Sequence, residues 1–242
     1  MEDSSIKSAW DTIDCIYVIG HVKYEEKRVK RVLQQLAELQ CPGEKVKVCA
    51  PTWGKELSNE QCFAVYDPWL PRNFPCFVFK SRGLSKGEIS LNLNFHGAIK
   101  DAHQMKYKNI MVLESDVMFR NDFRDRFPIL MEKASAVEYD YISLSDGTGT
   151  HNGPCTVQNI HTRPQELYPG KMPFPFRCTD SMIFRQNFIS FLAQHLLPFR
   201  DCLDWELNFR ILQFQGKAFW AEPHLIEQAS LKRVEGSILE AE

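Results

Sequence analysis

The sequence predicts an α/β protein with a mixed, mostly parallel central sheet flanked by helices, and three neighbouring patterns favour this class. Residues 13–20 are a short apolar run with Ile, Tyr and Val, typical of a buried strand. Residues 24–40 carry apolar side chains at helical spacing on one face. Residues 45–50 alternate apolar and polar side chains, as a strand does. Such a strand–helix–strand unit places its two strands parallel in one sheet.

The following part of the chain has fewer clear patterns. Residues 53–75 are rich in proline and aromatic side chains, which predicts a loop, and residues 77–80 predict a short strand. Residues 87–105 fit two periods, because their apolar side chains alternate at first and also form one helical face. The length of this segment favours a helix.

The second half of the chain supplies the remaining elements. Residues 109–114 are a continuous apolar run, which suits a central strand covered on both faces. Further strands are predicted at 139–145, 180–185 and 217–222, and helices at 123–136, 187–197 and 203–213. Residues 146–175 have little periodicity and many Gly, Pro, Thr and His residues, so we expect a long loop, which in a compact domain is usually functional or mobile.

Composition limits the classes of function. The 242 residues, 44% of them hydrophobic, can bury a sizeable core, and without a linker or repeat we expect a single domain over residues 1–242. A net charge of -2 argues against a nucleic-acid partner. The apolar runs are strand-sized, so no membrane span is expected. Residues 1–5 carry acids where a secretory signal needs bases, which predicts a cytoplasmic protein. The eight cysteines form no Cys-x-x-Cys pair, so free thiols are expected rather than zinc ligands or disulfides.

Two acids follow the predicted central strand at Glu114-Ser115-Asp116. Ligands of open α/β sheets bind outside the carboxyl ends of the strands. Mn²⁺ and Mg²⁺ prefer carboxylate oxygens, so Asp116 and Glu114 are candidate metal ligands. Such a metal would neutralise a diphosphate and stabilise it as a leaving group. The alternative is that the two acids are solvated and only open a turn.

The carboxyl end of the first strand should lie at the same edge of the sheet. The candidate contacts for the base and ribose of a bound nucleotide are therefore Val18, Ile19 and Gly20. Arg28 is a further candidate, although an arginine on a helix surface is usually only solvated.

The stretch Lys86-Gly87-Glu88-Ile89-Ser90 and the later run from Lys108 to Val117 together resemble glycosyltransferase family 25. That family includes bacterial lipopolysaccharide, collagen-modifying and virus-encoded enzymes. Its members show Gly-Glu-Ile-Gly-Cys, then a Ser-His pair, then an apolar strand ending in Glu-Asp-Asp-Val. In this chain Ser90-Leu91 replaces Gly-Cys, Asn94-Phe95 replaces Ser-His, and Ser115 replaces the middle Asp.

The resemblance implies a GT-A fold, which is a Rossmann-like single domain. It also implies Mn²⁺ (or Mg²⁺) as cofactor, a nucleoside-diphosphate sugar as donor, with a UDP-sugar favoured, and a glycan as acceptor. A virus-encoded protein acting in a host cell is one of the origins it allows. Asn94 is implied as a donor-site residue. Thr179-Asp180-Ser181 resembles the segment that faces the donor sugar, so Asp180 is a candidate for sugar hydroxyls, unless it caps a strand end.

A second acidic cluster spans residues 201–210. It resembles the Glu-Asp-x-x-Leu-x-x-Arg element of inverting GT-A enzymes, with Asp204 at the position of the catalytic base and Leu203 in place of the preceding acid. A base must remove the proton of the attacking sugar hydroxyl. The alternative is structural, with Asp201 as a helix N-cap and Asp204 as a favourable first-turn acid.

The frame Pro223-x-Leu225-x-x-Gln228 resembles the end of family 25 domains, which makes His224 a candidate further metal ligand. The alternative is an exposed loop histidine. Together these features predict a metal-dependent, inverting glycosyltransferase. A nucleotidyltransferase is the other enzyme class considered, although Gly20-His21-Val22-Lys23 is short for its phosphate loop. A catalytically inactive carbohydrate-binding GT-A domain is the non-enzyme alternative.

Overall fold

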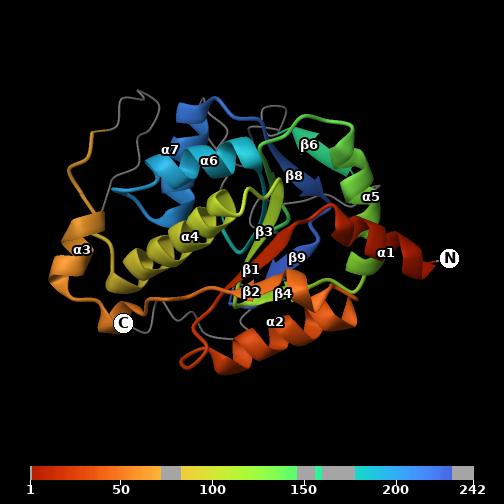
Figure 1. The fold of residues 1–242 in the computed structure, drawn as a ribbon, viewed down its shortest axis with the longest axis horizontal. Helices are drawn as coiled ribbons and strands as arrows, with labels where there is room; N and C mark the ends of the chain where they lie inside the picture. The colour runs from red at the N-terminus through yellow and green to blue at the C-terminus, as the bar shows by residue number, and fades with distance from the viewer. Residues whose placement is uncertain (1, 72–82, 146–155, 160–177, 231–242) are drawn as a thin grey trace.

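A seven-stranded sheet in the order β2–β1–β3–β7–β5–β8–β6 forms the centre of the computed structural model (Figure 1). The structure describes residues 2–71, 83–145, 156–159 and 178–230. The strands of this sheet are β1 (Cys15–Ile19), β2 (Val46–Val48), β3 (Asn109–Glu114), β5 (Tyr141–Ser143), β6 (Thr156–Asn159), β7 (Ser181–Arg185) and β8 (Ala218–Glu222).

The sheet is mostly parallel, as the sequence predicts. Strands β2, β1, β3, β5 and β8 run in one direction, and β7 and β6 run in the other. The antiparallel β7 lies between β3 and β5, with Leu113 opposite Ser181. Because of this register, the segment that enters β7 lies at the same edge of the sheet as the carboxyl ends of β1 and β3.

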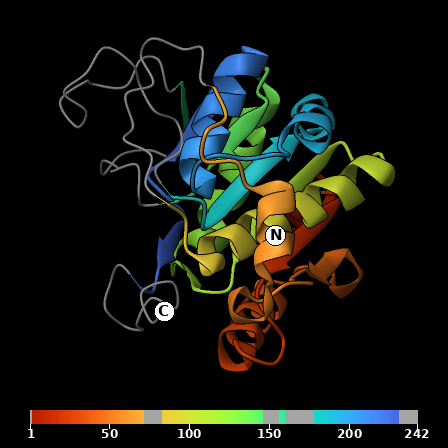
Figure 2. The same cartoon turned by 90° about the vertical axis from the view of Figure 1, so that its left-hand side faces the viewer.

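Helices cover both faces of the sheet (Figures 1 and 2). One face carries α1 (Glu2–Asp11), α2 (Glu26–Glu38) and α5 (Phe123–Ser135), and the other carries α4 (Lys86–Gln104), α6 (Gln186–His195) and α7 (Leu203–Phe214). Each layer has its own apolar core. In the first, Trp10 of α1 lies against Phe127 of α5 with ring centroids 4.7 Å apart. Such burial of large aromatic side chains packs α1 against α5, which lies on the same face of the sheet.

Most predicted elements are confirmed, including the helix rather than strand at 87–105. Its start is secured by a capping box in which Ser85 and Glu88 exchange hydrogen bonds with each other's backbone. The loop predicted at 53–75 is wrong in part, because this segment contains η2 (Gly54–Glu56) and α3 (Asn59–Val65). A further short helix, η1 (Gly43–Lys45), lies directly before β2. A second capping box, Ser58 with Gln61, starts α3 and was its sequence signal. The strand predicted at 77–80 lies outside the described residues, as does most of the loop at 146–175.

A second, two-stranded sheet was not predicted. Strands β4 (Val117–Phe119) and β9 (Ile226–Gln228) pair antiparallel, and β9 follows β8, the strand predicted at 217–222. Strands of three residues are too short to show a period of their own. Their pairing brings the segment around Gln228 beside the residues that follow β3.

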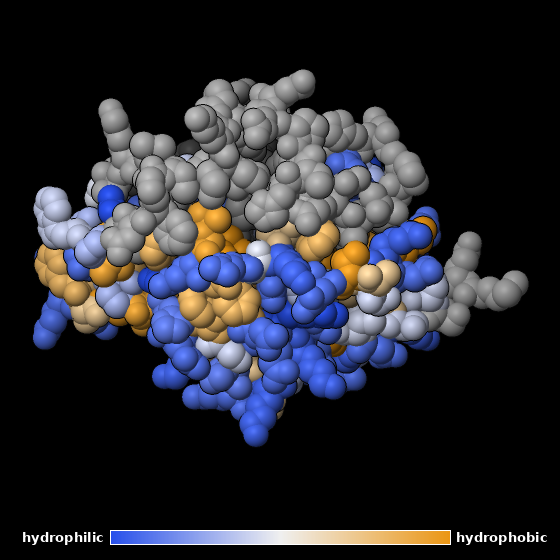
Figure 3. All heavy atoms as spheres, turned by 90° about the horizontal axis from the view of Figure 1, so that it is seen from above, coloured by the Kyte–Doolittle hydropathy of each residue, from blue (hydrophilic) through white to orange (hydrophobic). Residues whose placement is uncertain are grey.

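Hydrophilic side chains cover most of the described surface on the face seen in Figure 3, and hydrophobic residues form separate patches between them. No helix in the described ranges is long and apolar enough to cross a membrane. The described cysteines are free thiols.

Candidate functional site

A pocket lies at the carboxyl ends of β1 and β3, where open α/β sheets bind their ligands. These strands are neighbours, and Ile19 lies opposite Glu114. Trp53 and Gly54 of the segment after β2 close the pocket on one side, and α4 contributes to another wall. The structure brings six of the predicted site residues to this pocket, namely Ile19, Gly20, Arg28, Asn94, Glu114 and Asp116.

Asp116 is the least exposed of the acids that line the pocket, with 7% of its surface exposed. Its Oδ2 accepts a hydrogen bond of 2.7 Å from Ser230 Oγ, and its backbone oxygen accepts one of 2.9 Å from the Ala229 N–H. Oδ1 is buried and has no hydrogen-bond partner among the residues that the structure describes. A buried polar atom is normally paired, so this oxygen has the character of a ligand atom.

Glu114 is half-buried beside Asp116 and accepts a hydrogen bond of 2.7 Å from Thr179 Oγ1. Burial, followed by the negative charge of Asp116, raises the pKa of the Glu114 carboxyl to about 8. Two carboxyls this close disfavour each other's charge, and a cation between them would remove that penalty.

The raised pKa of Glu114 predicts how the stability of the metal-free protein depends on pH. The folded-state pKa of about 8 lies above the ordinary value of 4.5, so folding favours the protonated carboxyl. This contribution to stability is present at low pH and is lost as the pH rises through about 8. We expect the free energy of unfolding, measured by urea denaturation with EDTA, to fall as the pH rises from 4.5 to about 8. Glu114→Gln should flatten the fall, and equal pH slopes for the two proteins would contradict the assignment.

Glu25 is a site residue that the sequence did not reveal. Its Oε1 accepts a hydrogen bond of 2.6 Å from Ser115 Oγ, and its Oε2 accepts one of 2.8 Å from the His21 N–H. Arg28 Nη1 lies 4.0 Å from the same carboxylate. Glu25 therefore ties the loop after β1 to the acidic turn after β3, and it holds Arg28 beside the pocket. Nothing in the sequence separates it from the neighbouring solvated acids of α2.

Gly20 is packed too closely for a side chain. A Cβ at this position would lie 2.7 Å from Ser115 Cβ and 2.7 Å from Val29 Cγ2. We expect Gly20→Ala to cost about 1–3 kcal/mol of stability, the usual range for overpacking. Gly43→Ala is the matched control, because a Cβ added at Gly43 would have nothing within 4 Å. Chemical denaturation of both variants tests this, and equal midpoints would show that Ser115 and Val29 can move to accommodate the added methyl group at little cost in stability.

A second pocket adjoins the first and contains Asp204. The two pockets share Leu91, Glu114 and Gln228. Asp204 lies in the first turn of α7, where its Oδ1 accepts hydrogen bonds of 2.8 Å from the Trp205 N–H and 3.1 Å from Cys202 Sγ. Burial is the main cause that raises the pKa of Asp204 above its ordinary value. A carboxylate with a raised pKa is a stronger base, as proton abstraction requires.

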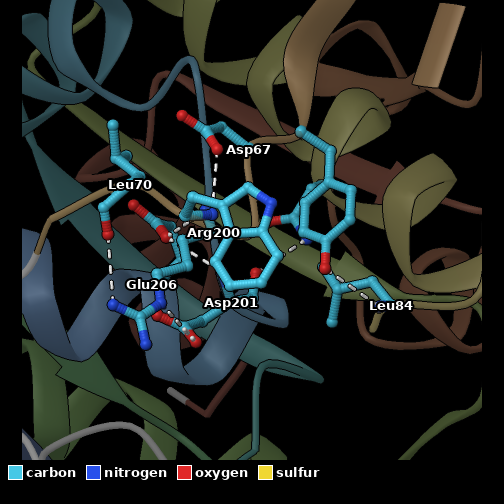
Figure 4. Close-up of polar contacts among 9 residues, drawn as sticks. Asp67, Leu70, Leu84, Arg200, Asp201 and Glu206 are labelled. Atoms are coloured by element: carbon cyan, nitrogen blue, oxygen red, sulfur yellow. Dashed lines mark hydrogen bonds and ion pairs between the residues drawn. The ribbon is translucent and has the colours of Figure 1, made fainter. Parts of the chain in front are cut away.

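Glu206, another acid of this cluster, stabilises the start of α7 (Figure 4). Glu206 is fully buried, pairs with Arg210 at 2.8 Å, and accepts hydrogen bonds from the N–H groups of Arg200 (3.0 Å) and Asp201 (3.3 Å). Arg200 Nη1 in turn donates to the Leu70 oxygen at 3.1 Å. The residue at the N-cap is Cys202, so the alternative with Asp201 as the cap is wrong. Asp204 is the acid of this cluster that lines the second pocket.

Four predicted contacts are placed differently from expectation. Val18 is fully buried, because its side chain points into the core under α2. Asp180 is fully buried, and its carboxylate accepts hydrogen bonds from Ser145 (2.6 Å) and Ser181 (3.0 Å). The Asn94 amide lines the first pocket but hydrogen-bonds to Thr52.

The fourth is His224. Arg120 Nη1 lies 3.2 Å from its Nε2, and Glu227 Oε1 lies 3.5 Å from the same atom. Neither pocket is lined by His224. Among the described residues, no three His, Cys, Asp or Glu side chains gather in an arrangement that could hold a metal. The roles predicted for these four residues stay predictions.

Comparison with known proteins gives a distant relationship. No family model matches the chain. The chain is 27% identical over 128 residues to procollagen galactosyltransferase 2 of Homo sapiens, and 28% identical over 130 residues to procollagen galactosyltransferase 2 of Mus musculus. Each match covers 53% of this chain and 20% of the relative, so the chain spans only a fraction of these relatives. The similarity supports a glycosyltransferase of the kind that the acidic motif resembles.

Proposed function

We propose that this protein is a glycosyltransferase that moves a sugar from a nucleoside-diphosphate donor to an acceptor hydroxyl, with inversion at the anomeric carbon. The observation that carries the proposal is the pair of adjoining pockets that share Glu114. One holds the buried oxygen of Asp116 that lacks a hydrogen-bond partner among the described residues, at the carboxyl edge of the sheet, and the other holds Asp204. The mixed α/β sheet is consistent with a GT-A fold, and the distant similarity to galactosyltransferases supports a glycosyltransferase.

The acidic turn fits a divalent cation such as Mn²⁺ or Mg²⁺. Asp116 Oδ1 and Glu114 would hold it, and Mg²⁺-type sites commonly use one or two carboxylates together with phosphates of the substrate. When bound, the cation neutralises charge on the departing diphosphate. His224 would first have to leave Arg120, so we assign it no part in this proposal.

The residues of the chain divide the remaining work between the two pockets. Arg28 suits a phosphate, because its guanidinium forms a planar fork of donors, and Ile19 and Gly20 line the donor side. In the adjoining pocket Asp204 takes the proton of the acceptor hydroxyl as that oxygen attacks the anomeric carbon. One base and one in-line displacement produce inversion.

A thermal-shift screen of nucleoside diphosphates and nucleotide sugars with Mn²⁺ tests the donor half of the proposal. A ligand at a hundredfold excess over its Kd stabilises the folded state by about 2.7 kcal/mol. The panel should include UDP-galactose, and procollagen peptides should be included among the acceptors, because the relatives are named procollagen galactosyltransferases. Transfer with inverted product stereochemistry supports the proposal. Binding with neither transfer nor hydrolysis would identify an inactive binding domain, and pyrophosphate release a nucleotidyltransferase.

A further inference from the structure

Three aromatic rings form one side of the first pocket and its rim. We call His21, Tyr24 and Trp53 the aromatic wall. Trp53 lines the pocket itself. The rings of Tyr24 and Trp53 are stacked, with centroids 4.9 Å apart and planes 28° apart, and His21 lies 4.6 Å from Tyr24 and 5.5 Å from Trp53. The three residues come from two segments of the chain, so only the fold brings their rings together.

The two outer rings are held in place by polar contacts. Tyr24 OH donates a hydrogen bond of 2.5 Å to Glu56, and Lys23 Nζ lies 3.2 Å from the same hydroxyl. His21 Nδ1 accepts hydrogen bonds from the N–H groups of Lys23 (3.2 Å) and Tyr24 (3.3 Å). Although Tyr24 is 41% exposed, its ring therefore has a fixed orientation behind Trp53.

The backbone on both sides of Trp53 is anchored to α4. On one side, Asn94 Oδ1 accepts from the Thr52 N–H at 3.0 Å, and Asn94 Nδ2 donates to the Thr52 oxygen at 3.0 Å. On the other side, Gly54 approaches α4 so closely that a Cβ would lie 2.7 Å from Gly87 N and 2.8 Å from Gly87 Cα. The amide of Asn94, predicted to contact the donor, serves here to position the residue next to Trp53.

The pocket therefore has two chemically different ends. The acidic turn and Arg28 suit phosphates and a cation, and the aromatic wall offers a fixed, flat apolar surface. A ligand that matches both ends carries phosphates and a planar ring. We propose that the aromatic wall is the base-binding subsite, an inference that rests on the proposed function. The donor's nucleobase stacks on Trp53, and Tyr24 supports Trp53 from behind.

Binding of UDP and of inorganic pyrophosphate, each with Mn²⁺, separates the two ends of the pocket. Isothermal titration of the whole chain gives a Kd for each probe. We expect Trp53→Ala to weaken UDP binding about tenfold to a hundredfold, the scale of one lost base–aromatic stack, and to leave pyrophosphate binding within about twofold. Trp53→Phe keeps a ring and should recover part of the UDP affinity. Trp69→Ala is the matched control, because Trp69 is 88% exposed and lines neither pocket.

If Trp53→Ala does not fold, Tyr24→Ala is tested in its place, because Tyr24 is at a more exposed position. We expect this variant to lose less affinity for UDP and to keep its affinity for pyrophosphate. Wild-type affinity for UDP in the ring-deleted variant overturns the inference and leaves the proposed function standing. Equal losses for UDP and pyrophosphate also overturn it, because they indicate a general distortion of the pocket. A wild-type chain that binds pyrophosphate but no nucleotide overturns both the inference and the proposed function.

Discussion

Asp116→Ala is expected to abolish cation-dependent binding of the donor nucleotide. Asp116 supplies a buried oxygen that has no hydrogen-bond partner in the described part of the chain, and no other described side chain presents such an oxygen to the first pocket. Without it, a cation would lose one of the two carboxylates proposed to hold it. Calorimetry with the best nucleotide, with and without Mn²⁺, measures the effect. We expect the affinity gained from Mn²⁺ to disappear and the weak, cation-independent part to remain.

Ser230→Ala is the matched control for this variant. Alanine at 116 also removes the hydrogen bond of 2.7 Å between Ser230 Oγ and Asp116 Oδ2. Ser230→Ala removes only that bond and keeps the carboxylate, so it should retain most of the response to Mn²⁺. If the nucleotide binds Asp116→Ala with unchanged dependence on Mn²⁺, the cation lies elsewhere. If Ser230→Ala loses as much, the position of the carboxylate is what matters.

Asp204→Asn is expected to reduce sugar transfer at least a hundredfold and to leave nucleotide affinity near the wild-type value. General-base catalysis is typically worth about 10²–10⁴-fold in rate, or roughly 3–5 kcal/mol of barrier. Asparagine keeps the size of the side chain and can still accept the hydrogen bond from Trp205, but it cannot act as a strong base. Because the pKa of Asp204 is raised, wild-type transfer should also decline, as the pH falls, at a higher pH than an ordinary aspartate would give.

Glu206→Gln provides the contrast that a structural acid should show. Breaking a buried ion pair on one side typically costs about 3–5 kcal/mol of stability. Glu206 is fully buried and pairs with Arg210 at 2.8 Å, so this variant should unfold at lower denaturant concentration, whereas Asp204→Asn should not. Transfer at the wild-type rate by Asp204→Asn would show that the base is misassigned. Product stereochemistry by NMR gives an independent answer, since a single displacement inverts the anomeric carbon.

The elements with strong periodicity could be predicted from the sequence, and those made by tertiary pairing could not. The apolar run at 109–114 and the long amphipathic segment at 87–105 carry enough residues to reveal their type. The strands β4 and β9 have three residues each, and they are strands because they pair with each other in the folded protein. The same limit applies to α3, whose signal was its capping box rather than its periodicity.

The candidate site shows the same division. The acidic turn could be predicted because its residues are contiguous and follow a recognisable strand. Glu25, Gln228, Ser230 and Trp53 come from other segments, so their convergence depends on the fold. Val18 shows a further limit, because alternate residues of a strand point to opposite faces. Ile19 faces the α4 layer and the pocket, and Val18 faces the α2 layer.

The pairing of β9 with β4 has a consequence for the order in which the protein gains its structure. Ser230 and Asp116 are 114 positions apart in the chain, and the contact between them completes the acidic turn. Contacts between distant segments carry a high loop-closure entropy and tend to form late in folding. During synthesis, β1, α2 and β3 can associate well before residues 226–230 have been made. We therefore expect the acidic turn to be completed late in folding, and a chain that has not yet placed β9 lacks the hydrogen bond from Ser230 to Asp116.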